Sequence, residues 1–120
     1  MLTREQCLKL RDAGMEQTLD FGDRYYAVDG YTNVHPGPTG WSGKACLKIP
    51  STDELMEFVL HAAQAQCDRT STVALIKDVR GGCEAFIDNY DGDVLWDALS
   101  DDLSAALYAL FEKMTGGAAR

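Results

Sequence analysis

Histidine and cysteine, the side chains that most often supply nucleophilic catalysis or bind zinc, are few and scattered in this sequence. There are two histidines, His35 and His61, and four cysteines with no Cys-x-x-Cys pair among them. Zinc ribbons and thiol redox sites need such a pair, and a cysteine or serine nucleophile needs a histidine brought close to it. We therefore expect no enzymatic activity, no bound metal and no cofactor.

His35 is the histidine best placed to serve a site, because it stands in a predicted loop that also holds Trp41. Loops on a rigid scaffold often carry binding residues. The alternative is that His35 is an ordinary exposed loop residue. His61 lies between Leu60 and Ala62 on a predicted helix, and we expect it to be a partly covered residue on the helix flank. His35 and Trp41 are kept as secondary candidates for a binding site.

Two loops match ligand-binding motifs only in part. A phosphate-binding loop over residues 37–44 would need Gly in place of Pro38 and Ser or Thr in place of Ala45, followed by a helix. Aligning Gly92 in the acidic stretch Asp88–Asp93 with the invariant glycine of an EF-hand loop places Ile87 at the first ligand position and Ala98 at the last. We expect neither a nucleotide site nor an EF-hand, and leave open a weak cation site in the acidic stretch.

Negative charge is concentrated in one part of the chain. The 120 residues include 19 acidic and 11 basic side chains, for a formal charge of −8 and an isoelectric point near 4.5. Residues 81–112 contain eight acidic residues and no Lys or Arg, so this segment alone carries the net charge of the whole chain. Proteins that hold nucleic acid need Lys and Arg for the phosphates. We therefore expect no direct nucleic-acid binding, and expect a basic partner instead.

The acidic segment is the predicted contact surface for that partner. Carboxylates held on one surface could match the charge density of a nucleic-acid backbone and fill an Arg/Lys-lined groove. Tyr90, beside a turn, could anchor the contact, whereas Trp96 follows two apolar residues and is expected in the core. The alternative is that the carboxylates only keep the protein soluble. The predicted partner-binding residues are Asp88, Tyr90, Asp91, Asp93, Asp97, Asp101 and Asp102.

Caps and apolar periodicity predict three helices. The first has a capping box of Thr3 and Gln6 and a glycine stop at Gly14. The last has Ser100 as its cap and two aspartates in its first turn, where the helix dipole favours negative charge. The predicted helices run over 4–13, from Ser51 to about Gln66, and from Ser100 to Gly116.

β-Branched and aromatic runs between turn residues predict four strands, and residues 33–44 are predicted to form a long loop. The resulting order is α-β-β-α-β-β-α. We expect an α+β fold with the helices packed on one face of a small, mainly antiparallel four-stranded sheet, in a single domain of residues 1–120. The run Arg24–Thr32 is predicted to form a strand and a tight turn at Asp29–Gly30, and the other predicted strands are Ala45–Ile49, Thr72–Ile76 and Cys83–Asp88.

About half of the chain resembles a loose group of small acidic proteins encoded by tailed phages and prophages. The resemblance lies in Leu10–Gln17, Tyr25–Gly30, Ile49–Leu55 and Asp101–Leu107. These segments correspond to helix caps, turns and apolar faces of the core, so they contain no catalytic motif. The resemblance implies a phage origin, and small acidic phage proteins include inhibitors of host defences such as anti-CRISPR proteins.

Charge and resemblance together predict a non-enzymatic, anti-CRISPR-like inhibitor. We expect it to bind the basic nucleic-acid-binding site of a host defence complex through its acidic surface, for example as a nucleic-acid mimic. The alternative is a phage accessory or structural protein whose acidic surface only confers solubility, with a homodimer through the first helix as one option. The first residues lack a secretory signal and no apolar run is long enough to cross a bilayer, so we expect a cytoplasmic protein in the host cell.

Overall fold

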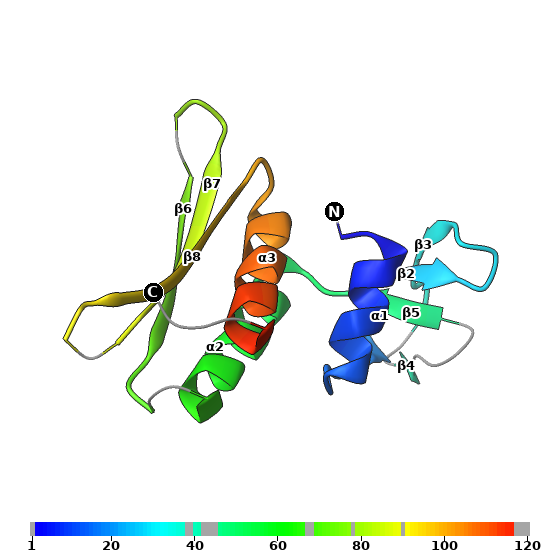
Figure 1. Cartoon of the computed structure of the whole chain (residues 1–120). Coiled ribbons are helices and arrows are strands. Elements are labelled where there is room, and N and C mark those ends of the chain that lie inside the picture. Colours follow the sequence, from blue (N-terminus) through cyan, green and yellow to red (C-terminus); the bar gives the residue numbers. More distant parts are fainter. Residues whose placement is uncertain are drawn as a thin grey trace. The chain divides into compact units, whose positions relative to one another are not determined.

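The computed structural model describes residues 2–37, 40–41, 46–66, 69–77, 79–89 and 91–116 (Figure 1). Within these residues the fold is α+β, as the sequence predicts. The chain divides into two compact units, Met1–Ser51 and Thr52–Arg120, and each is described by itself. Among the described helices, none combines the length and the apolar composition needed to span a bilayer. The helices are α1 (Arg4–Asp12), α2 (Thr52–Gln66) and α3 (Leu103–Gly116).

Helix α1 has the caps that its sequence predicts at both ends. The backbone N–H of Gln6 donates to the Thr3 hydroxyl over 3.2 Å, and the Gln6 side chain accepts from the Thr3 N–H over 2.9 Å. At the other end Gly14 adopts a φ of 100°, and the Met15 N–H donates to the Leu10 carbonyl over 3.0 Å. Local sequence therefore determines both ends of this helix.

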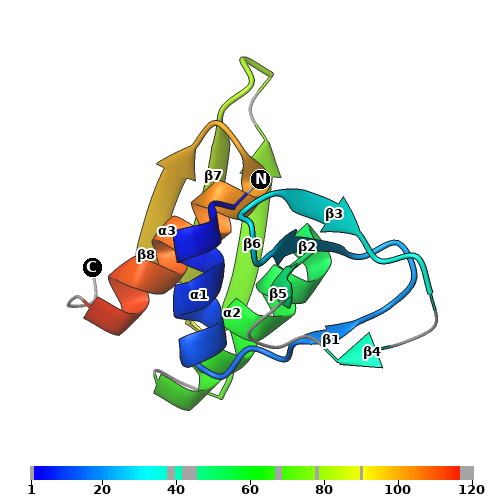
Figure 2. The same ribbon diagram turned by 90° about the vertical axis from the view of Figure 1, so that its right-hand side faces the viewer.

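The first unit contains a three-stranded antiparallel sheet of order β3-β2-β5 and a two-stranded pair, β1 with β4 (Figure 2). The predicted loop over 33–44 is wrong at two places, because residues 33–34 belong to β3 and residues 40–41 form β4. Strand β3 is exposed along its whole length, so it shows none of the burial alternation that identifies a strand in a sequence. The strands are β1 (Thr18–Leu19), β2 (Arg24–Ala27), β3 (Thr32–Val34), β4 (Gly40–Trp41) and β5 (Cys46–Ile49).

Cys7 of α1 is a buried thiol near Tyr26 of β2. Burial raises the pKa of Cys7 from 9.0 to about 11, and the pKa of Tyr26 is raised by burial and by the proximity of Cys7. The Tyr26 hydroxyl donates to the Leu2 carbonyl over 2.6 Å. Cys83 is another free thiol among the described residues, and Cys67 lies outside them. The thiol of Cys7 is therefore protonated and shielded at neutral pH.

We expect the free energy of unfolding to fall more steeply with pH above 9 in the wild type than in Cys7→Ala. A folded-state pKa of about 11 means that the unfolded chain releases the Cys7 proton first, so the stabilisation present below pH 9 is lost as the pH rises toward 11. Urea titrations of the full chain at several pH values measure this. Parallel curves for the two proteins would contradict it.

The second unit is built on an antiparallel sheet of order β6-β7-β8, with α2 and α3 packed on one face (Figure 1). The predicted single four-stranded sheet is therefore wrong: the strands before and after α2 belong to separate sheets. The structure also contains a strand, β8, that the sequence prediction left out. The strands are β6 (Thr72–Lys77), β7 (Cys83–Asp88) and β8 (Val94–Ser100).

Helix α3 begins at Leu103, so its cap position lies two residues later than predicted. Ser100 is the last residue of β8 and pairs with Cys83, so it cannot cap the helix. Asp102 occupies that position, since it directly precedes Leu103 and its carbonyl accepts from the Ala106 N–H over 2.9 Å. The predicted apolar stripe of α3 is buried from Ala106 onward, and the core of the unit also includes Tyr108, which the stripe omitted.

Two serines of the second unit are expected to respond to alanine substitution in opposite directions. Ser71 is 1% exposed and its hydroxyl is buried without a hydrogen-bond partner in the described structure, so Ser71→Ala should stabilise the fold by about 1 kcal/mol. The Ser104 hydroxyl lies 3.1 Å from the Thr52 hydroxyl, so Ser104→Ala should cost about 0.5 kcal/mol despite the higher helix propensity of alanine. Urea denaturation of both variants gives the two signs.

Candidate protein-binding face

Alternate residues of the β6-β7-β8 sheet point away from α2 and α3. On β7 the burial alternates strictly, with Cys83, Ala85 and Ile87 buried and the residues between them only half-buried. Cross-strand partners share a face, so the register places nine side chains in three rows on the side opposite the helices. We call this surface the outer face. Its rows are Ile76, Glu84 and Leu99; Ala74, Phe86 and Asp97; Thr72, Asp88 and Val94.

The outer face exposes several large apolar side chains, which a surface that only keeps a protein soluble would not require. Leu99 is 75% exposed, Ile76 is 51% exposed and Val94 is 37% exposed. Phe86 stands at the centre of the nine positions, half-buried among them. Apolar side chains gathered on one side of a sheet indicate a contact surface more than scattered single ones do.

Carboxylates separate these apolar groups. Glu84 and Asp88 lie on β7 on either side of Phe86, about 14 Å apart along the strand, and Asp97 lies directly across from Phe86 on β8. Neither Glu84 nor Asp88 forms an ion pair in the described part of the chain. One oxygen of Asp88, Oδ1, is buried and has no hydrogen-bond donor there. None of the nine positions is Lys or Arg, so the outer face is negatively charged.

Basic side chains stand at the rim of the outer face. The ammonium of Lys113 donates to the backbone carbonyl of Asp97 over 2.8 Å. An open hollow of about 480 Å³ extends from the row of Ile76, Glu84 and Leu99 to the β6–β7 turn. Its walls are apolar apart from Lys77 and Glu84, so it could receive an apolar side chain of a partner. The hollow is lined by Ile76, Lys77, Val79, Gly82, Cys83, Glu84 and Leu99.

The seven predicted contact residues occupy three different places. Asp88 and Asp97 lie on the outer face, and Asp91 and Asp93 lie at the β7–β8 turn, where the Asp93 N–H donates to the Asn89 side chain over 2.9 Å. Asp101 and Asp102 follow the other end of β8 (Figure 1), and Asp102 caps α3. The predicted anchor, Tyr90, lies outside the described residues.

The secondary candidates belong to the first unit. The His35 N–H donates to the Asp23 carbonyl over 2.8 Å, and its own carbonyl accepts from the Gly22 N–H, so its backbone extends the pairing beside β3. Trp41 pairs with Thr18 in the β1–β4 ladder, and its side chain lies outside the described part of the structure.

Four residues of the outer face are not among those that the sequence predicts for partner binding: Ile76, Glu84, Phe86 and Leu99. For Glu84 and Phe86 the signal is the period of two in residues 83–88, where small or branched apolar residues alternate with Glu, Phe and Asp. This alternation predicts one face on the core and another facing away from it. Trp96, predicted as a core residue, is half-buried and pairs with Ile87 on the helix-covered face.

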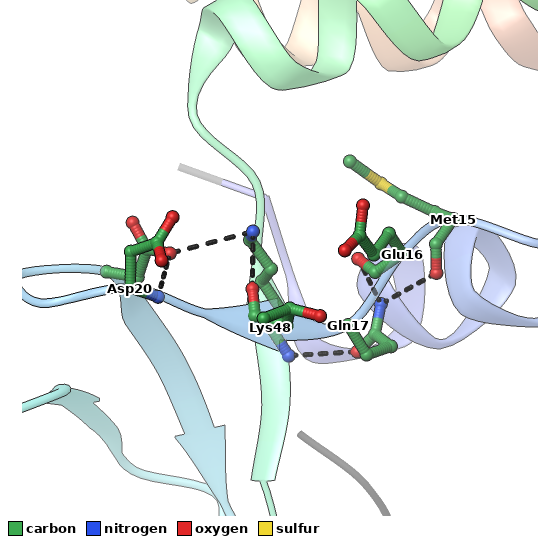
Figure 3. A network of polar contacts seen from close by, with 7 residues as sticks. Met15, Glu16, Gln17, Asp20 and Lys48 are labelled. Carbon is green, nitrogen blue, oxygen red and sulfur yellow. Dashed lines mark hydrogen bonds and ion pairs between the residues drawn. The ribbon is translucent and has the colours of Figure 1, made fainter. Parts of the chain in front are cut away.

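A buried lysine in the first unit forms a separate polar network (Figure 3). Lys48 of β5 is 5% exposed, and its ammonium donates to the Thr18 carbonyl over 2.7 Å and lies 3.6 Å from the Asp23 carboxylate. Its N–H donates to the Gln17 side chain over 3.1 Å, and the Asp20 N–H donates to Asp23. These contacts link β1 to β5 and compensate the buried charge, which makes a structural role the best account of Lys48.

Comparison with known proteins adds no further information about the site: no protein family, curated protein or solved structure was found that matches this chain. Among the described residues, no group of three or more His, Cys, Asp or Glu side chains could hold a metal ion.

Proposed function

We propose that this chain acts by binding a protein partner, and that its outer face contacts a surface on which Lys or Arg side chains lie among apolar ones. The observation that supports this is the combination of exposed Leu99 and Ile76 with the carboxylates of Glu84 and Asp88, which form no ion pair among the described residues. Apolar contacts supply affinity at such an interface, while the carboxylates steer and select a basic partner. A face that served solubility alone would have no use for the exposed leucine and isoleucine.

The nucleic-acid-binding site of a host defence complex is the proposed class of target. Such a site is rich in Lys and Arg, and its occupation by an acidic protein would block the nucleic acid without any catalysis. The charge density favours blocking over close mimicry. Duplex DNA carries roughly eight phosphates over about 14 Å of axis, whereas the outer face has three carboxylates over that length. The proposed inhibitor thus makes a protein-like contact.

Affinity purification from a host lysate tests this function, with the tagged full chain as bait and Glu84→Lys/Asp88→Lys as the paired bait. We expect the wild type to capture a nucleic-acid-binding protein and to reduce its nucleic-acid binding, and the variant to do neither. Equal capture and equal inhibition by both baits would remove the outer face from the function. Reversal of Asp91 and Asp93 in the turn is expected to have a smaller effect, which distinguishes the outer face from the acidic hairpin as a whole.

A further inference from the structure

We infer that the partner places an amphipathic α-helix along β7 on the outer face. This inference rests on the proposed function and specifies the form of the partner. The face is three strands wide, and its two outer strands are about 10 Å apart, which is close to the diameter of one helix with its side chains. On the opposite face of the same sheet, helices α2 and α3 already pack against these strands.

The order of residues along β7 determines the pattern that the helix must present. Glu84, Phe86 and Asp88 follow one another on the same face of β7. Each of these side chains is about 7 Å along the strand from the next, so an aromatic ring lies between two acids. On a helix, positions i and i+7 share a face about 10.5 Å apart, with i+3 and i+4 between them. The two acids are about 14 Å apart, so Lys or Arg at i and i+7 would reach Glu84 and Asp88 by directing their long side chains outward along the helix axis, and apolar residues at i+3 and i+4 would cover Phe86.

The flanking residues of the outer face fit the same arrangement. Ile76 and Leu99 stand on either side of Glu84, where they would contact the methylene stem of a Lys or Arg whose head group meets the carboxylate. Val94 stands beside Asp88 at the other end. A second copy of this chain is a poor occupant, because two outer faces brought together would oppose their own carboxylates.

Peptide binding to the full chain tests the inference. The probes are three fluorescein-labelled peptides of one composition and about 16 residues, since shorter helices are marginal in water. The first has Lys at i and i+7 and Leu at i+3 and i+4. The second has the same residues reordered so that Lys and Leu lie on opposite helix faces, and the third has the first order with D-amino acids at alternate positions to prevent a helix.

Fluorescence anisotropy is expected to show the first peptide binding at least about tenfold more tightly than the other two, with a gain in helical circular dichroism on binding. Glu84→Gln/Asp88→Asn, which keeps the shape of both side chains, should weaken the first peptide about tenfold and reduce its salt dependence. Binding of all three peptides within twofold of one another would overturn the helix while leaving the basic-surface function intact. Failure of the first peptide to bind, or binding insensitive to the Gln/Asn variant, would overturn it as well.

Discussion

Replacing both Glu84 and Asp88 by lysine is expected to weaken partner binding by more than a hundredfold. The two carboxylates form no ion pair in the described structure, so reversal removes two attractions and introduces two repulsions against a basic surface. Like-charge juxtaposition in an interface costs several kcal/mol, and about 2.7 kcal/mol already corresponds to a hundredfold change in Kd. The loss should be largest at low ionic strength, because salt screens attraction and repulsion alike.

The matched control is Glu57→Lys/Glu112→Lys. Both glutamates are exposed on helices, and the double reversal changes the formal charge of −8 by the same amount. We expect this variant to retain binding within about threefold, because only the long-range field changes. Biolayer interferometry with the captured partner measures both variants, and thermal melting confirms that they fold. Similar losses in the two variants would show that net charge, and not the outer face, determines binding.

Lys48→Ala is expected to lower the free energy of unfolding by about 3 kcal/mol, which is the largest stability effect among the substitutions considered. The Lys48 side chain is 6% exposed, and its removal would leave the Thr18 carbonyl without this donor and the Asp23 carboxylate without its neighbouring cation. A cavity from the lost methylene groups adds to the cost. Urea denaturation followed by circular dichroism measures the change.

Two further variants separate charge from packing at Lys48. Lys48→Met keeps most of the buried volume but leaves the charge of Asp23 without the Lys48 cation. The Lys48→Met variant should therefore be less stable than the wild type. Adding Asp23→Asn removes that charge while keeping an oxygen for the Asp20 N–H, which donates over 2.7 Å, so the double variant should recover part of the loss. Lys9→Ala, at an exposed lysine of α1, should change stability by less than about 0.5 kcal/mol. A loss at Lys48 no larger than that at Lys9 would contradict the network.

Local signals in the sequence predict much of the fold. The capping box at Thr3 and the left-handed glycine at Gly14 each act within a few residues, so their geometry follows from residue type alone. The apolar stripe of α3 is similarly local. These features identify all three helices to within a residue or two at most ends.

Strand pairing could not be predicted in the same way. Four predicted strands fit one sheet as well as two, because hydrogen-bond partners far apart in sequence leave no local mark. Strand β8 was not predicted for two reasons. A register shift against Ile87 and Asp88 of β7 interrupts the alternation of its side chains between the two faces, and Ser100 is also a residue type typical of a helix cap. The outer face depends on β8 for Leu99 and Asp97, so the site could not be assembled before the strand was known.

The contact between Lys113 and β8 has a consequence for assembly. Strand β8 is an outermost strand of its sheet, and such strands offer backbone groups to which any other extended chain can pair. The Lys113 ammonium already occupies the Asp97 carbonyl, and the irregular ladder next to Val94 disturbs the straight geometry that an incoming strand would need. Addition of further strands at this edge is thereby discouraged, and with it the joining of copies of the chain into fibres.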